Sequence, residues 1–275
     1  MQRLVLNNGS AVPRVGLGVW PLTDDQAYTA VTHALEAGYR RIDTARVYRN
    51  EEGVGRAVRD VGIPRPEVFL TTKLGNADQG YDRTLRAFDA SVRSLGTDYV
   101  DLYLIHWPLP RQARYVESYR ALELLHAEGR ARAVGVSNFT AATLGRLLAE
   151  TGVVPAVNQI ELHPYLPQER MRTLAAEHSI ATEAWSPLAQ GGRLLAEPAL
   201  ARIADRYGKT PAQVVIRWHL QLGNLVIPRS ATPARIRENI GVFDFALGPE
   251  DLSAIAALAD GGRIGPNPDT FDPRG

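Results

Sequence analysis

The stretch Arg40–Asn50, RRIDTARVYRN, begins as a short strand that ends in an acid, Asp43, and it carries a tyrosine, Tyr48, five residues later. Asn50 and the two glutamates that follow it are typical of the start of a helix. Aspartate is depleted in strands and is rarely buried without a partner. We therefore expect Asp43 to have a cationic partner elsewhere in the chain.

Short strands and helices alternate on both sides of this stretch. Eight strands are predicted, at residues 15–18, 40–43, 68–73, 99–107, 132–137, 156–162, 180–185 and 225–228. Helices are predicted at residues 24–37, 51–61, 82–95, 115–128, 141–150, 168–178, 210–222 and 233–240, with a proline-glycine loop after the seventh strand. An Asn-Gly pair predicts an N-terminal β-hairpin. Residues 250–258 form an extra C-terminal helix in this interpretation, and an irregular tail rich in glycine and proline follows from Gly261.

This alternation predicts an α/β fold with a parallel sheet, and eight β/α units predict a closed (β/α)8 TIM barrel. An open, doubly wound sheet is the alternative. No shift in composition marks a linker, so residues 1–275 are interpreted as a single domain. In a barrel of this kind the chemistry lies where strands end and loops begin.

Composition excludes several functions. The 31 basic and 30 acidic residues leave a net charge of +1, which gives no electrostatic reason to expect nucleic acid or an anionic membrane as a partner. There is no cysteine, so disulfides and thiolate nucleophiles are excluded. The N-terminus has no apolar leader and no long apolar run follows, so we expect a soluble, cytoplasmic protein. We also expect a monomer.

The predicted strand ends carry residues whose chemistry fits together. Asp43 ends the second strand, Lys73 the third, and His106 lies near the end of the fourth, with Tyr48 in the loop after Asp43. Each of them alone would more often cap a loop, pack or face solvent. Together, a lysine ammonium favours the phenolate of a nearby tyrosine, an aspartate balances the lysine, and a histidine binds a substrate oxygen. Such a set can donate a proton to a carbonyl oxygen that gains charge during reduction.

The chain resembles the aldo-keto reductases over nearly its whole length. The motifs that carry the resemblance are GLGVW, GYRRIDTARVYRNEEGVG, TTKL, DYVDLYLIHWP, AVGVSNF, VVPAVNQIELHP, WSPLAQG and VIPRSATPARIRENI. The bacterial branch that includes 2,5-diketo-D-gluconate reductases is the most similar, also in the ending GPNPDTFD. The resemblance implies that Tyr48 is the general acid, that Lys73 lowers its pKa, that Asp43 holds Lys73, and that His106 orients the carbonyl.

The hydride must come from a cofactor, because no side chain donates one. The Gly-x-Gly pairs at Gly16 and Gly53 lack the third glycine of a Rossmann fingerprint. The resemblance instead implies NADPH, bound along the later strand ends. Its contacts fall on Ser137, Asn138 and Gln159 near the nicotinamide carboxamide, Trp185 stacked on the ring, and Ser186, Pro187, Leu188 and Gln190 along the pyrophosphate. On the adenosine side they fall on Arg229, Ser230, Ala231, Thr232 and Arg235 around the 2′-phosphate, and on Glu238 and Asn239 at the adenine.

The substrate pocket is expected beside Tyr48 and His106, with Trp20, Val47, Trp107 and the Phe271 region as apolar walls. Family members often carry a tryptophan where this chain has Gly75, so we expect a wide pocket. The predicted substrates are small-molecule carbonyls, including aldehydes, α-keto esters, diketones and acids that resemble diketo-gluconate. The tail after Gly261 either covers the site or is disordered.

Three other functions fit the sequence less well. A hydrolase is disfavoured because Gly135–Phe139, GVSNF, lacks the second glycine of a nucleophile elbow. No metal site is expected, because the six histidines form neither an HxH nor an HExxH pattern. The alternative from another class is a regulatory barrel that binds the cofactor with little turnover.

Overall fold

In the computed structural model, which describes residues 2–273, eight parallel strands form one sheet in the order β10-β9-β8-β7-β6-β5-β4-β3. They are β3 (Leu17–Gly18), β4 (Arg41–Asp43), β5 (Phe69–Leu74), β6 (Val100–Ile105), β7 (Ala131–Ser137), β8 (Val157–Glu161), β9 (Ala181–Trp185) and β10 (Leu225–Val226). Parallel bridges from Val15 to Val226 and from Gly18 to Arg229 join the two edges. The sheet is thereby closed on itself, and the predicted (β/α)8 barrel is confirmed.

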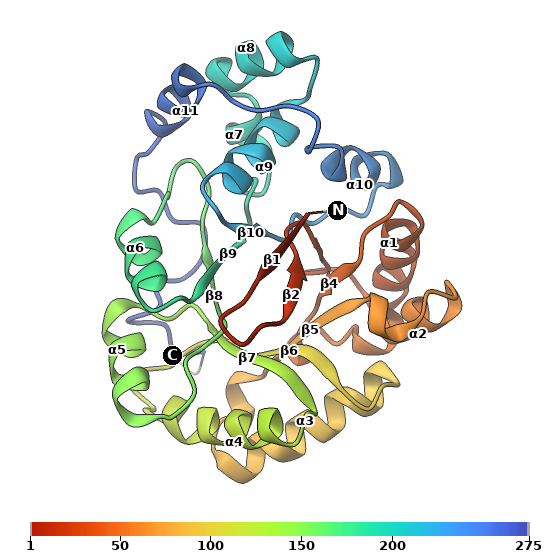
Figure 1. Cartoon of the computed structure of the whole chain (residues 1–275), viewed down its shortest axis with the longest axis vertical. Helices are drawn as coiled ribbons and strands as arrows, with labels where there is room; N and C mark the ends of the chain where they lie inside the picture. Colours follow the sequence, from red (N-terminus) through yellow and green to blue (C-terminus); the bar gives the residue numbers. More distant parts are fainter. Residues whose placement is uncertain (1, 274–275) are drawn as a thin grey trace.

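Helices surround the strands on the outside (Figure 1). They are α1 (Asp24–Glu36), α2 (Glu51–Asp60), α3 (Tyr81–Leu95), α4 (Tyr115–Ala127), α5 (Ala141–Glu150), α6 (Glu169–Glu177), α7 (Gly192–Leu195), α8 (Pro198–Tyr207), α9 (Pro211–Gln221), α10 (Pro233–Ile240) and α11 (Pro249–Ala256). The predicted start of α9 is confirmed, since the Thr210 side chain accepts a hydrogen bond from the backbone of Gln213 and Pro211 takes the first helical position. Within residues 2–273, no helix has the length and apolar character needed to cross a membrane.

The prediction was wrong for the segment between β9 and α9, which it assigned to a loop. This segment contains the helix α8. Pro198 takes its first turn, Leu200, Ile203 and Ala204 form a buried apolar face, and Gly208 ends it in the left-handed conformation. The apolar spacing is visible in the sequence, but glycines and prolines typical of a loop lie close to it on both sides.

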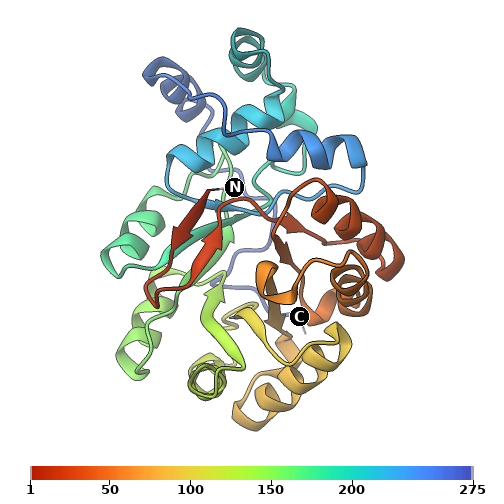
Figure 2. The same cartoon turned by 45° about the vertical axis from the view of Figure 1, so that its right-hand side comes forward.

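The N-terminal hairpin, β1 (Arg3–Val5) and β2 (Ala11–Pro13), closes one end of the barrel. The side-chain amides of Asn7 and Asn8 donate to the backbone oxygens of Pro155 (3.0 Å) and Arg132 (2.9 Å), which lie near the starts of strands. Buried apolar side chains of the hairpin, Leu6 and Val12, pack in the lower barrel core with Leu102 and Leu104 of β6. Figures 1 and 2 show the hairpin in front of the strands and the C-terminal tail behind them. The hairpin therefore leaves only the C-terminal ends of the strands open to ligands.

Candidate active site

The strand ends bring three of the predicted catalytic side chains together. Asp43 is the last residue of β4, Lys73 lies one residue before the end of β5, and His106 directly follows β6. Because β4, β5 and β6 are parallel neighbours, these side chains emerge at the same end of the barrel. Tyr48 comes from the short 3-10 helix η1 (Arg46–Tyr48) in the loop after β4.

A hydrogen-bonded side chain below this loop holds it in place. Asn50 is buried; its amide donates to the backbone oxygen of Leu22 (2.9 Å), and its oxygen accepts from the Thr44 hydroxyl (2.7 Å). Thr44 also offers its backbone oxygen to Lys73 Nζ at 3.0 Å. The loop that carries Tyr48 is thus tied to the strand ends beneath it.

The cationic partner expected for Asp43 is Lys73. The two side chains form an ion pair, and both are buried. Lys73 Nζ lies 5.1 Å from the centroid of the Tyr48 ring. The Tyr48 hydroxyl lies 3.3 Å from Nε2 of His106. The geometry therefore joins all four predicted catalytic residues.

Burial and neighbouring charges together shift the pKa values of the side chains at this site. It raises the pKa of the Tyr48 phenol above its ordinary value, and the neighbouring Lys73 ammonium offsets this only in part. Burial lowers the pKa of Lys73, but Asp43 and Tyr48 outweigh it, so the net shift is upward. Burial, with help from Lys73, holds the pKa of His106 well below its ordinary range. At neutral pH the site therefore has a protonated phenol, a charged ammonium and a neutral imidazole.

The net pKa shift of the Tyr48 phenol is opposite in direction to the expected one. The resemblance implies that Lys73 lowers the pKa of the phenol, and its electrostatic effect does act in that direction. The effect of lost water around the partly buried phenol is larger, which the sequence alone could not show.

A hollow of about 460 Å³ opens above these side chains. Tyr48, His106 and Asp43 lie at its wall together with the predicted substrate residues Trp20, Val47 and Trp107. Predicted cofactor residues line the rest of it: Ser137, Asn138, Gln159, Trp185, Ser186, Gln190 and Arg229. The other predicted cofactor residues do not line the hollow; these are Pro187, Leu188, Ser230, Ala231, Thr232, Arg235, Glu238 and Asn239.

Hydrogen bonds fix the side chains next to the catalytic group. The Asn138 amide donates to the backbone oxygen of His106 (2.9 Å) and accepts from the indole of Trp185 (2.8 Å). Ser137 donates to the backbone oxygen of Gln159 (2.9 Å). The Trp185 ring is therefore locked in position at the end of β9 before any ligand arrives.

The loop after β9 holds an unusual backbone. Ser186, Ala189 and Gln190 all have positive φ (48°, 47° and 59°), a backbone conformation that residues other than glycine rarely adopt. Strain of this kind costs on the order of 1–3 kcal/mol per residue and is concentrated at ligand sites. It supports the prediction that this loop contacts a ligand.

Of the two predicted phosphate-binding arginines, Arg229 lines the hollow and Arg235 lies beyond it on α10. Arg229 and Arg235 are exposed, and neither has an ion-pair partner among residues 2–273. Guanidinium groups left free in this way suit a phosphate ligand. Glu238, expected at the adenine, has one carboxylate oxygen that accepts from the Thr210 hydroxyl (2.6 Å).

The tail after Gly261 lies against the site, which decides between the two alternatives for it. The buried carboxylate of Glu161 accepts hydrogen bonds from the backbone nitrogens of Ile264 and Gly265. The ring of Phe271 lies 4.5 Å from that of Trp107. Gly265 packs so closely on β9 that an added Cβ would lie 2.5 Å from Cη2 of Trp185. The tail forms part of the wall.

Two side chains lie close to Gly75, where the sequence predicts a wide pocket. A Cβ at this position would lie 2.8 Å from an oxygen of Asp78 and 3.3 Å from Val47. Asp78 is held there by Arg46 at 3.1 Å. Asp78 and Val47 therefore occupy part of the space beside Gly75, and the wide pocket stays a prediction.

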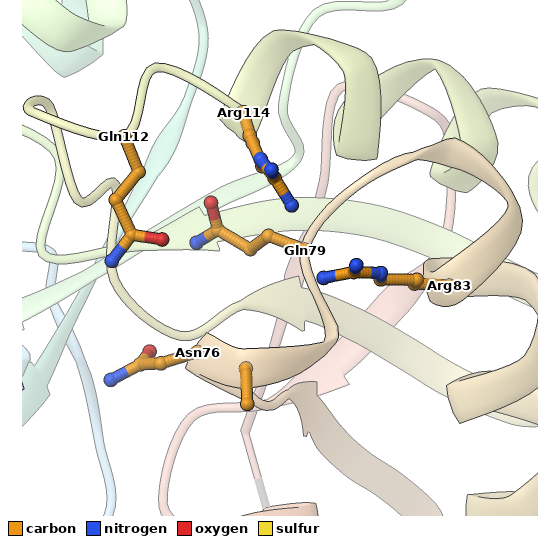
Figure 3. A pocket seen from close by; sticks show the side chains of 6 residues that line it. Asn76, Gln79, Arg83, Gln112 and Arg114 are labelled. Atoms are coloured by element: carbon orange, nitrogen blue, oxygen red, sulfur yellow. The ribbon is translucent and has the colours of Figure 1, made fainter.

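A second hollow, of about 380 Å³, lies beside the site between the starts of α3 and α4. Figure 3 shows Arg83 and Arg114 pointing toward Gln79 there. Neither guanidinium has an ion-pair partner among residues 2–273. The buried Gln79 amide donates to the backbone oxygen of Trp107 (2.7 Å), while its oxygen accepts no hydrogen bond from residues 2–273. Asn76 lines both hollows, so they adjoin.

Sequence reasoning missed two buried charges in the barrel, Arg41 on β4 and Glu183 on β9, which form an ion pair. Their presence in strands expected to be buried was the available signal. It also missed Thr44 and the tail residue Gly265.

Comparison with known proteins identifies the family. The family model described as the aldo/keto reductase family matches residues 14–260. An aldo-keto reductase of Mycolicibacterium smegmatis is 57% identical over 270 residues, 98% of each chain. The methylglyoxal reductase DkgA of Escherichia coli is 49% identical over 267 residues, 97% of this chain and 96% of that protein. A crystal structure of a Gox0644 mutant in complex with NADPH superposes with a TM-score of 0.94 at 47% identity and 98% coverage of both chains. The chain therefore belongs to the aldo/keto reductase family, as its motifs predict.

Proposed function

We propose that this protein reduces aldehydes and ketones to alcohols with NADPH and that Tyr48 donates the proton. One observation carries the proposal: a buried Lys73–Asp43 ion pair lies below Tyr48, whose hydroxyl contacts His106, at the wall of a hollow that also presents the predicted nicotinamide contacts. Bound NADPH supplies a hydride to the carbonyl carbon. The NADPH complex of the similar Gox0644 protein supports this choice of cofactor.

The residues present fit a dinucleotide. Gln159 has a free amide oxygen at the hollow, Trp185 presents an indole ring fixed by Asn138, and Arg229 and Arg235 are free to bind phosphate. The strained loop after β9 lies between these two groups of contacts.

The chain's own part in the reaction is proton transfer. His106, neutral because its pKa is low, offers an N–H to the carbonyl oxygen. Tyr48, protonated because its pKa is high, gives its proton to the same oxygen. Lys73 stabilises the phenolate that is left, and Asp43 keeps Lys73 charged and in place.

The substrates we propose are aldehydes, diketones and α-keto esters, taken up between Trp20, Trp107 and Phe271. The similarity to proteins named methylglyoxal reductase supports small dicarbonyls as one class. The two free arginines of the adjoining hollow, Arg83 and Arg114, support substrates with an anionic end as another.

The test is NADPH oxidation, followed by absorbance, with a panel of carbonyl compounds and the Tyr48→Phe variant. This change removes only the hydroxyl, so kcat should fall about 10²- to 10⁴-fold while the Kd for NADPH stays within about twofold. Tyr28→Phe, which removes a surface hydroxyl bonded to Asp60, is the control and should be unaffected. Binding of NADPH without oxidation by any compound of the panel would support the regulatory barrel instead.

A further inference from the structure

The side chain of Gln159 has its orientation imposed by two carboxylates. Its Nε2 donates to Asp43 Oδ2 at 2.9 Å and to Glu183 Oε1 at 2.8 Å. Carboxylate oxygens next to bound cations only accept hydrogen bonds, so the nitrogen of the amide must face them. Both of its hydrogens are then used, and the amide oxygen is the only group of Gln159 left for a ligand in the hollow.

The second carboxylate, Glu183, is itself held by a buried cation. Its other oxygen forms an ion pair with Arg41, and neither side chain is exposed. Arg41 also donates to the backbone oxygen of Pro13 at 3.3 Å. Gly16 makes room for this side chain, since an added Cβ would lie 2.9 Å from Cγ of Arg41. The barrel thus keeps a specific place for a guanidinium beneath its polar centre.

The stability of a barrel does not by itself require such a pair. Desolvation of two buried charges is often as large as their attraction, and apolar side chains of similar volume commonly serve a fold as well. What the pair adds is a second anchor. With Asp43 alone the amide of Gln159 could swing about one hydrogen bond, since its terminal torsion is soft; with Glu183 its plane is fixed.

We propose that Arg41 and Glu183 are positioning residues that lock Gln159 as a hydrogen-bond acceptor, so that the protein recognises the amide N–H of the nicotinamide carboxamide. This inference rests on the proposed function, in which Gln159 contacts that carboxamide. It assigns the recognition of one atom of the cofactor to a buried ion pair that does not line the hollow.

The test pairs two protein variants with two cofactors. The 3-acetylpyridine analogue of NADP+ carries a methyl group in place of the amide nitrogen, so it cannot donate to Gln159. Arg41→Met/Glu183→Gln keeps an acceptor for Gln159, whereas Arg41→Met/Glu183→Leu removes it, and both lack the buried charges. The Kd of each cofactor is measured by quenching of tryptophan fluorescence, after circular dichroism has confirmed folding.

Wild type and the Gln-containing double variant should bind the analogue about fivefold to tenfold more weakly than NADP+, as loss of one hydrogen bond implies. In the Leu-containing variant the ratio of the Kd of the analogue to the Kd of NADP+ should fall to about twofold or less. NADP+ itself should bind more weakly to this variant. Arg206→Met, which removes an ion pair between α8 and α11, controls for general loosening and should keep the wild-type ratio.

An unchanged ratio in the Leu-containing variant would overturn the inference and leave the proposed function standing. Failure of wild type to bind NADP+ at all would overturn the proposed function. If the Leu-containing variant does not fold, NMR of the labelled wild type decides. The chemical shifts of the two Nε2 protons of Gln159 should change little when NADP+ binds. Large changes in both chemical shifts would show that these protons are donated to the cofactor, and would overturn the inference.

Discussion

Burial and neighbouring charges determine which of the predicted catalytic side chains are protonated at neutral pH. The Asp43–Lys73 pair, the protonated Tyr48 and the neutral His106 all follow from groups removed from water and set beside one another. The consequence can be measured as a dependence of the rate on pH.

In the proposed reaction Tyr48 must be in its protonated form, which is present below the pKa of the phenol and lost above it. Burial raises that pKa above its ordinary value, so kcat/KM for reduction should stay level from about pH 6 to 9 and fall only above about pH 10. The low pKa of His106 means that no inflection should appear near pH 6.5. A step in the profile between about pH 6 and 8.5 would contradict the assignment of a neutral His106 and a protonated Tyr48 over this range. The Tyr48→Phe variant should lack the alkaline fall.

Individual residues were predicted unevenly from the sequence. An acid at the end of a strand implies a cation, so the partner of Asp43 could be expected, and Lys73 at the next strand end supplied it. Arg41 and Glu183 lie 142 positions apart on strands that are not neighbours in the sheet. Sequence order does not give that pairing, and it gives no measure of burial, which is why the net pKa shift of Tyr48 was missed.

At the scale of elements, the expected ligand contacts outside the catalytic group lie at the starts of helices. The start of α10 is expected to hold the 2′-phosphate, and the starts of α3 and α4 border the second, basic hollow. Strand and helix order were predicted well because apolar periodicity is local. The helix α8 was missed because glycines and prolines on both sides of it resembled those of a loop.

The arginines at the start of α10 should determine the choice between NADPH and NADH. Loss of a charge-assisted hydrogen bond costs about 1.5–3 kcal/mol, so Arg235→Ala should lower the ratio of kcat/KM for NADPH over NADH by tenfold or more. Arg229→Ala should act in the same direction. Arg237→Ala, an exposed arginine of the same helix, is the control. A wild type that uses NADH as efficiently as NADPH would refute the assignment.

The hollow between α3 and α4 should favour substrates with a negative charge. Replacement of Arg83 and Arg114 by alanine should lower kcat/KM for 4-carboxybenzaldehyde by about twofold to fivefold, the range for exposed ion pairs. The uncharged methyl ester of the same aldehyde should be reduced as before. Arg86→Ala, elsewhere on α3, should leave both substrates unchanged. Equal losses for the acid and the ester would show that the hollow does not recognise charge.

At the scale of the whole molecule, the barrel, its closing hairpin and the extra helix α11 follow the prediction. So does membership of the aldo/keto reductase family, an oxidoreductase family that uses NADP(H). Relatives named DkgA represent the predicted bacterial branch. The single domain, the monomer, the cytoplasmic location and the absence of nucleic-acid partners stay predictions. The place of the tail could not be predicted, because it depends on contacts with strand ends that are distant in sequence.

The tail and the cofactor site should be coupled through one glycine. In Gly265→Ala the new methyl group would lie 2.5 Å from the Trp185 ring and 3.2 Å from Glu161, so either the ring or the tail must move. We expect KM for NADPH to rise several-fold with little change in the melting temperature. Gly145→Ala on α5, where an added Cβ meets nothing within 4 Å, should change neither quantity for the worse. An unaltered KM in Gly265→Ala would separate the tail from cofactor binding.

The contact of Phe271 with Trp107 has a practical consequence for handling the enzyme. A purification tag or surface linker inserted directly after Phe271 would begin close to the mouth through which substrates must pass. The hairpin lies at the opposite end of the barrel, so immobilisation through the N-terminus should present that mouth to the solution and preserve turnover on a solid support.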